Sequence, residues 1–341
     1  NYIASTGGNG GTAYTMTGNS THFAHYWQAY SSGVQVKAIR IYERSNPSVF
    51  QFEVSLNDDA TFTFSDDYIA ILEHGNSGGV KIYQLSDGSQ YSSFTPNNQH
   101  SFSADIAFWG NDKVIVGAGN DSPDYIHLYG ISGNLLGSIN ANWIGNTLAV
   151  SGDKLFASDK WYNGNYGRVY VIDLPTFAIT SYIQSPTYSE QEYFGQTVES
   201  NDEYLLVSRR AYNGQNGNSE EIYPGAVDIF NVSDGSFVAT FEQPNPSINY
   251  SLGHVKDQRE QGNMSISGNF AALSNKQRGT SDIKIQIIDV RDGTSVSEIS
   301  INSLFGQNGG DCEVFLDGEN LYVLNNANRT CLLYTSPSPR D

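Results

Sequence analysis

One short apolar pattern recurs along the chain and limits its fold more than any other feature. It reads apolar-x-apolar-apolar-x-apolar, often followed by Asp-Gly, as in Val80–Gly88 and Val227–Gly235. The second residue of the adjacent apolar pair recurs every 41 to 58 residues. These positions are Tyr42, Tyr83, Tyr129, Ile172, Phe230, Ile288 and Tyr334. Short apolar runs bounded by Gly, Asn and Asp are typical of β-strands, and their regular spacing indicates a repeated β unit.

A tight polar turn lies upstream of each copy and leads into another apolar strand. These turns are Thr17–Asn19, Ser65–Asp67, Gly110–Asp112, Ser151–Asp153, Ser200–Asp202, Ser267–Asn269 and Asp317–Glu319. Gly, Asn and Asp tolerate the positive φ that a tight hairpin needs. Each unit therefore reads as strand, tight turn, strand, longer loop, strand, Asp-Gly turn and strand.

These units predict an all-β fold, a seven-bladed β-propeller of four-stranded blades that forms a single domain over residues 1–341. The expected blades cover about 13–55, 58–95, 102–140, 146–184, 194–242, 262–301 and 311–336. The last unit lacks a fourth strand, and residues 1–6 are left over before the first unit. We expect residues 1–6 to close the ring by joining the last blade, a 3+1 closure that reduces exposed edges. Two β-sandwiches are the alternative.

Composition narrows the classes of partner. The chain has 18 Lys plus Arg against 36 Asp plus Glu, a formal net charge of −18. Such a charge repels phosphate, so we expect no nucleic-acid partner and no binding to an anionic membrane surface. No apolar run approaches the ~18 residues of a membrane span. A chain that is acidic and rich in Gly and Tyr, and in which only 16% of the residues are charged, is typical of secreted β proteins. We therefore expect an extracellular or cell-surface location.

Two units resemble FG-GAP repeats, the repeats of the integrin α-chain propeller. The resemblance lies in Phe194–Val198 with Gly225–Phe230, in Val114–Gly119 and in the pair Phe305-Gly306. It implies a propeller fold and an extracellular role in adhesion, and its residues report fold rather than chemistry.

The FG-GAP family often holds calcium in loops of the Asp-x-Asp-x-Asp-Gly kind, and this spacing is absent from the chain. Asn57–Asp59 and Asn120–Asp124 are the nearest segments, and solvated turns explain both. We expect no cofactor and no metal site, with calcium bound through carbonyl oxygens as the alternative.

No catalytic constellation stands out, so we expect no catalytic residues. Gly75–Gly79 matches G-x-S-x-G, but it lies between two expected strands, whereas that motif needs a strand–Ser–helix elbow. His22 and His25 are separated by an odd number along one expected strand, which places their rings on opposite faces. Acidic residues on the expected inner strands are Asp105, Glu199 and Glu313. They leave a polysaccharide-active propeller, a hydrolase or lyase, as the alternative function.

The two cysteines and six glycosylation sequons bear on the compartment. Cys312 and Cys331 are expected on two strands that a third strand separates by ~9–10 Å, which is too far for a disulfide unless one of them lies in an offset loop. Cys331–Asp341 also resembles a translated sequencing adapter. The N-x-S/T sequons are Asn19, Asn120, Asn231, Asn249, Asn263 and Asn328, and they permit glycosylation.

Loop lengths give the main functional clue. The loops between the second and third strands are long, as in Tyr26–Gly33, Asp159–Gly167 and Arg209–Gly225, and they lie on one face of a propeller with the long link Gln243–Gln261. The aromatic residues expected to form a binding face there are Tyr26, Trp27, Tyr30, Trp161, Tyr162, Tyr212 and Tyr223. We expect a non-enzymatic extracellular propeller for adhesion or assembly, with a protein or glycan partner and self-assembly into a filament or polymer as a further possibility.

Overall fold

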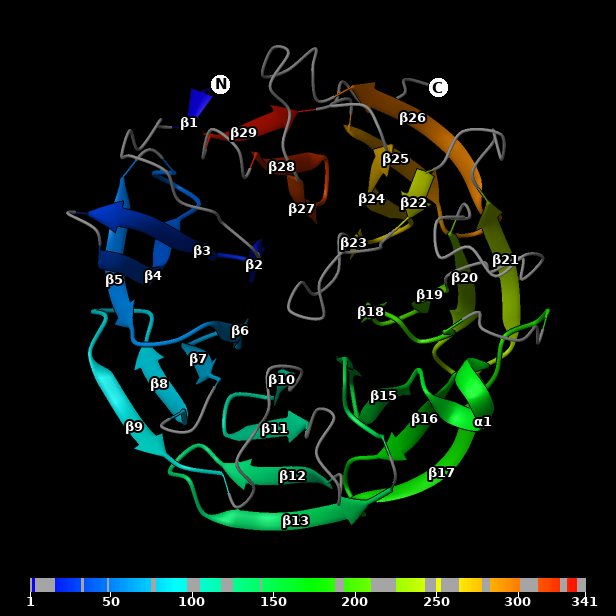
Figure 1. Cartoon of the computed structure of the whole chain (residues 1–341), viewed down its shortest axis with the longest axis horizontal. Coiled ribbons are helices and arrows are strands. Elements are labelled where there is room, and N and C mark those ends of the chain that lie inside the picture. The colour runs from blue at the N-terminus through cyan, green and yellow to red at the C-terminus, as the bar shows by residue number, and fades with distance from the viewer. Residues whose placement is uncertain are drawn as a thin grey trace.

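Antiparallel strands build almost all of the described chain. The computed structural model describes residues 2–3, 16–31, 34–47, 49–74, 78–96, 105–117, 125–141, 143–187, 193–209, 225–242, 250–252, 264–277, 283–300, 312–325 and 330–335. Within these ranges one short helix, α1 (Tyr162–Asn165), accompanies the strands. The sheets are arranged like blades around a central axis, with their first strands innermost (Figure 1). The β-propeller architecture predicted from the repeat is therefore present.

Six sheets have four strands each. The first three are β2 (Met16–Gly18), β3 (His22–Ser31), β4 (Val34–Glu43) and β5 (Phe50–Leu56); β6 (Ala60–Phe64), β7 (Tyr68–Glu73), β8 (Val80–Gln84) and β9 (Gln90–Phe94); and β10 (Ile106–Trp109), β11 (Lys113–Gly117), β12 (Tyr125–Gly130) and β13 (Leu135–Asn140). The others are β14 (Leu148–Ser151), β15 (Lys154–Asp159), β16 (Arg168–Asp173) and β17 (Ala178–Ile183); β18 (Val198–Ser200), β19 (Tyr204–Arg209), β20 (Ala226–Asn231) and β21 (Phe237–Glu242); and β27 (Cys312–Asp317), β28 (Asn320–Asn325), β29 (Thr330–Thr335) and β1 (Tyr2–Ile3).

The predicted fold class, a seven-bladed β-propeller of four-stranded blades, is wrong in its number of blades. The propeller has six four-stranded blades, and the remaining sheet has five strands: β22 (Tyr250–Leu252), β23 (Met264–Ser267), β24 (Phe270–Gln277), β25 (Ile283–Asp289) and β26 (Thr294–Ser300). Both β22 and β23 pair with the same edge of β24, one beyond the other. The strand β24 has eight residues, and β23 pairs with only part of its edge. The strand β22 pairs with a further part of the same edge and reduces its exposure. The long link expected over Gln243–Gln261 therefore contains a strand.

The N-terminal strand lies beside β29. Tyr2 pairs with Leu332 and Ile3 with Cys331, so β1 is the outermost strand of the sheet that β27 begins. Residues 2–3 thus occupy the position expected for the closing strand, within the longer range of 1–6. On the other side of the same seam, β2 follows as the first strand of the next sheet (Figure 1).

A β-bulge lies opposite the recurring apolar pair in most sheets. In six sheets the pairing of the third strand with the fourth shifts register at the apolar pair, for example between Ile82 and Tyr83. The other shifts fall at Ile41/Tyr42, Leu128/Tyr129, Val171/Ile172, Ile229/Phe230 and Ile287/Ile288. Each shift leaves one extra residue on the fourth strand, as Tyr91 between the partners of Ile82 and Tyr83. A bulge of this kind bends its strand and increases the local twist, as the curved outer strands require.

The core lies between neighbouring sheets. Inner strands are covered on both faces, so β7 is buried almost without a break, whereas most of β17 is exposed at the rim. One cluster joins Ile115 and Leu128 of one sheet to Leu155 and Ile172 of the next. Because each sheet is packed between two others, burial of apolar area holds the ring together throughout its circumference.

Polar contacts join each pair of adjacent sheets at one end of the ring, which we call the turn face. This end carries the turns between first and second strands and those between third and fourth strands. The contacts are Asn19 Nδ2 to Ser65 O (2.6 Å), Asp66 N to Asn111 Oδ1 (2.9 Å), Trp109 Nε1 to Asp153 Oδ1 (3.2 Å), Lys154 Nζ to Val232 O (2.7 Å), Asn201 Nδ2 to Gly268 O (2.8 Å), Gly318 N to Ser267 Oγ (2.9 Å) and the ion pair of Arg44 with Asp317. We call this set the turn-face belt.

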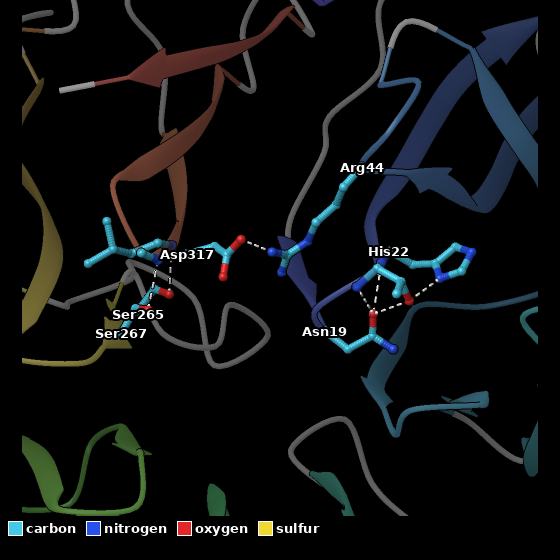
Figure 2. Close-up of polar contacts among 9 residues, drawn as sticks. Asn19, His22, Arg44, Ser265, Ser267 and Asp317 are labelled. Carbon is cyan, nitrogen blue, oxygen red and sulfur yellow. Dashed lines mark hydrogen bonds and ion pairs between the residues drawn. The ribbon is translucent and has the colours of Figure 1, made fainter. Parts of the chain in front are cut away.

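Figure 2 shows the part of the belt that spans the seam. Arg44, from the turn after β4, reaches Asp317 at the end of β27, and Ser265 and Ser267 of β23 accept backbone hydrogen bonds from the same β27 segment. On the other side, the side-chain oxygen of Asn19 accepts hydrogen bonds from the backbone of Thr21 and His22. The turn face thus carries polar contacts that join neighbouring sheets.

Candidate functional site

The opposite end, which we call the loop face, carries the loops between second and third strands and the links between sheets. In the sheet β14–β17 the described residues include a whole loop, 160–167, and parts of the links on either side. Backbone hydrogen bonds hold these segments together: Gly145 N donates to Ser158 O (2.9 Å), and Tyr193 N donates to Asn165 O (2.8 Å). Gly167 and Phe194 also form a parallel bridge. Three segments that are separate in the sequence therefore form one surface.

Partly exposed aromatic rings gather on this surface. Trp161 and Tyr193 meet edge to face with their ring centroids 5.3 Å apart. Tyr162 follows Trp161 at the start of α1, and Trp143, in the preceding link, is 42% exposed. Exposed aromatic rings of this kind provide large contact areas at low cost in conformational entropy.

Backbone strain is concentrated on the same surface. Five non-glycine residues in the described ranges have positive φ, and four of them are Trp143 (60°), Asn163 (48°), Asn165 (77°) and Tyr193 (49°). Positive φ is unfavourable for bulky residues, and such strain persists only where the surroundings enforce it. Its concentration beside exposed aromatic rings marks this surface as the best candidate for a binding site.

Two cations on this surface differ in how they are compensated. The guanidinium of Arg168 lies 3.7 Å from the ring centroid of Tyr162 and 4.3 Å from that of Tyr170. Its Nε donates to Asp159 Oδ2 at 3.1 Å, so its charge is neutralised within the protein. Lys160 is only 8% exposed, and its Nζ lies 5.5 Å from the ring centroid of Trp161. Burial lowers the pKa of Lys160, and no acidic side chain of the described residues counteracts that effect.

We call Lys160, Trp161, Tyr162, Arg168 and Tyr193 the aromatic loop cluster. The sequence pointed to Trp161 and Tyr162 because they lie in a long loop between expected strands, and the structure places both there. It missed Lys160 and Tyr193, since nothing in the local sequence shows that Lys160 is buried or that Tyr193 reaches Trp161.

The other predicted binding residues lie elsewhere. The prediction of a loop over Tyr26–Gly33 is wrong, because β3 continues to Ser31 and pairs along its length with β4. Tyr26 is 1% exposed and donates its hydroxyl to Asp59 Oδ1 at 3.0 Å, while the Trp27 ring lies 4.0 Å from the guanidinium of Arg40. Tyr30 also belongs to β3. Tyr212 and Tyr223 lie outside the described residues.

Two of the six glycosylation sequons fall within the described residues. Asn19 lies in the turn after β2 and is part of the turn-face belt, and Asn231 ends β20 with its Nδ2 2.8 Å from Ser236 Oγ. The other candidates, Asn120, Asn249, Asn263 and Asn328, lie outside the described residues.

One pair of the predicted acidic residues interacts electrostatically between sheets. Burial and the carboxylate of Asp105 raise the pKa of Glu199, on β18, to about 8. Asp105 precedes β10 in another sheet, and it accepts hydrogen bonds from the backbone amides of Ile106 and Leu148, each at 2.8 Å. Glu313, on β27, is 4% exposed. The sequence named all three residues, but it could not show that Asp105 and Glu199 interact across sheets.

Other candidate sites have structural explanations. The Nζ of Lys37 lies 2.8 Å from Asp59 Oδ1 and 3.4 Å from Asp58 Oδ1, so a cation of the protein already occupies the segment considered for calcium. Asn120–Asp124 lies outside the described residues. Within the described ranges, no group of three or more His, Cys, Asp or Glu side chains could hold a metal ion.

The remaining motifs follow the strand geometry. His25 is buried against the hydroxyl of Tyr42, with its pKa lowered to about 4 mainly by burial, whereas His22 is partly exposed. Gly75–Gly79 lies between β7 and β8, as expected. Cys312 pairs with Asn325 and Cys331 with Leu324, so β28 separates the strands of the two cysteines.

Comparisons with known proteins show a similarity of fold alone. No protein-family model matches the sequence, and no curated protein matches it. Hydrazine synthase from Kuenenia stuttgartiensis has a similar structure, with a TM-score of 0.65 and 14% identity over 95% of each chain. BamB from Moraxella catarrhalis gives a TM-score of 0.53 and 11% identity over 96% of this chain and 95% of its own. Within the described residues, no helix is long and apolar enough to span a membrane. The chain is thus similar in fold to these two β-propeller proteins, whose names differ from each other.

Proposed function

We propose that the chain is a non-enzymatic extracellular β-propeller that serves adhesion or assembly by binding a glycan or protein partner on its loop face. The aromatic loop cluster carries this proposal, since it combines partly exposed rings, fixed cations and strained backbone in one place. The turn face differs, because several polar groups of its turns join neighbouring sheets. The resemblance to FG-GAP repeats and the acidic composition, with its small share of charged residues, favour an extracellular adhesive role. This role includes that of a structural subunit in a secreted polymer.

A glycan array and sedimentation over a range of concentrations test this function. We expect wild-type protein to retain a set of glycans or to self-associate, and Trp161→Ala to lose that property. Tyr26→Phe is the matched control, because Tyr26 is an aromatic residue of the same predicted set that lies buried in β3. A protein that stays monomeric and retains no glycan would count against adhesion and assembly alike.

A second candidate function rests on Asp105 and Glu199. Retention of a proton by Glu199 near neutral pH would provide a general acid, and a second carboxylate nearby would provide a base or nucleophile, the pairing used by glycoside hydrolases. Release of reducing ends from a polysaccharide panel by wild type, lost in Glu199→Gln and Asp105→Asn, would support an enzyme. No release from any polysaccharide would leave the binding function as the better explanation.

A further inference from the structure

Lys160 is the least compensated charge of the aromatic loop cluster. Lys160 exposes only 8% of its surface, and burial, which disfavours the charged form, lowers its pKa. Asp159, its neighbour in sequence, is paired with Arg168 at 3.1 Å, and the described residues place no carboxylate in ion-pair contact with Lys160. A buried ammonium without a counter-ion is costly, and an anion supplied by a ligand would relieve that cost.

The ring next to Lys160 indicates what else such a ligand carries. The Nζ lies 5.5 Å from the centroid of Trp161, and Tyr193 meets the same ring edge to face. A ligand that reached the ammonium would therefore pass over a partly exposed indole. A uronic acid meets both conditions, because its ring offers an apolar C–H face while its carboxylate projects from the ring edge. An acidic peptide offers the carboxylate on a flexible chain without a flat apolar face.

We propose that Lys160, Trp161 and Tyr193 form a subsite for one uronic-acid residue of an acidic glycan. The ammonium binds the carboxylate and the indole stacks against the sugar ring. This inference rests on the proposed function and specifies its ligand. The net charge of −18 is compatible with this subsite, because at physiological ionic strength charges beyond ~8 Å are largely screened and a short oligosaccharide contacts only the local surface.

Calorimetric titration of the full chain tests the subsite directly. The probes are trimers of galacturonate, glucuronate and mannuronate, each paired with its carboxyl-reduced neutral counterpart. We expect at least one acidic trimer to bind and its neutral counterpart to bind about tenfold more weakly or worse, as loss of a charge-assisted hydrogen bond implies. Lys160→Met, which keeps the apolar stem, should lower the affinity for the acidic trimer by about the same factor.

Lys113→Met is the matched control. Lys113 also lies against an indole, 4.7 Å from the centroid of Trp109, but Asp112 Oδ1 compensates it at 2.8 Å on the turn face. Its substitution should leave the affinity unchanged. Equal binding of acidic and neutral trimers, an unaltered affinity in Lys160→Met, or binding of hexaglutamate but of no uronate would overturn the proposal. If a glycan is bound in a Trp161-dependent manner despite such a result, the uronate subsite fails while the proposed adhesive function stands.

Discussion

Arg44 and Asp317 lie 273 positions apart in the chain and form an ion pair across the seam where the last sheet meets the first (Figure 2). Arg44 also lies 5.0 Å from the ring centroid of Phe315, so it contributes apolar packing to the same junction. The pair completes the turn-face belt, which otherwise links sheets that follow one another in sequence. Closure of the ring is thus secured at its turn face independently of the pairing of β1 with β29.

Arg44→Met should weaken this closure. We expect the free energy of unfolding in urea to fall by about 1 kcal/mol, a modest value because Asp317 is 39% exposed and solvent screens the pair. Arg291→Met is the control, since Arg291 is an exposed residue whose ion pair among the described residues is with Asp289, two positions away. Equal destabilisation by both substitutions would contradict a special role for the seam.

Asn201→Asp tests another member of the belt. The substitution keeps the oxygen that accepts hydrogen bonds from the backbone of Glu203 and Tyr204, but it replaces the amide that donates to Gly268 O with a second acceptor. We expect a loss of about 1–2 kcal/mol in unfolding free energy. Asp202→Asn, at the exposed neighbouring position, should change stability little, and a loss of similar size there would argue against the contact between sheets.

Stability should depend on pH through Glu199. Its pKa is raised in the folded state to about 8, so between its ordinary value of 4.5 and 8 the folded protein holds a proton that the unfolded chain has released. Stability from this group is therefore complete below pH ~4.5 and is lost as the pH rises through about 8. Glu199→Gln should flatten the decline of the melting temperature between pH 5 and 8. An identical decline in both proteins would show that Glu199 does not titrate in this range.

Tyr26→Phe should lower the stability of the protein without affecting ligand binding. Removal of the hydroxyl ends the hydrogen bond to Asp59, and we expect the free energy of unfolding to fall by about 1 kcal/mol with ligand binding unaffected. Reduced ligand binding by a folded Tyr26→Phe protein would indicate that Tyr26 takes part in binding.

The repeat that revealed the propeller has a physical cause. The adjacent apolar residues, such as Ile82 and Tyr83, lie on opposite faces of a strand that neighbouring sheets cover on both sides, and each packs in a different core cluster. Burial of consecutive residues appears as a local apolar pattern, so the sequence could reveal it. The turn-forming Gly, Asn and Asp residues are equally local, and they located the strands.

The errors arose where pairing extends beyond the repeat. The segment β22 is three residues long and carries no repeat signature, and it forms a strand only because the far end of β24 offers it an edge. The hairpin of β3 and β4 also exceeds the expected unit, and the aromatic residues read as a loop, Tyr26 and Trp27, are equally typical of strands. Interactions between sheets, such as the electrostatic effect of Asp105 on Glu199, depend on tertiary structure and leave no local pattern.

The binding role of the loop face is tested most directly by one glycan array probed in parallel with wild type, Trp161→Ala and Tyr26→Phe. We expect wild type and Tyr26→Phe to retain the same glycans and Trp161→Ala to retain none of them. Retention of the same glycans by all three proteins, or of no glycan by wild type, would contradict recognition of a glycan through the aromatic loop cluster.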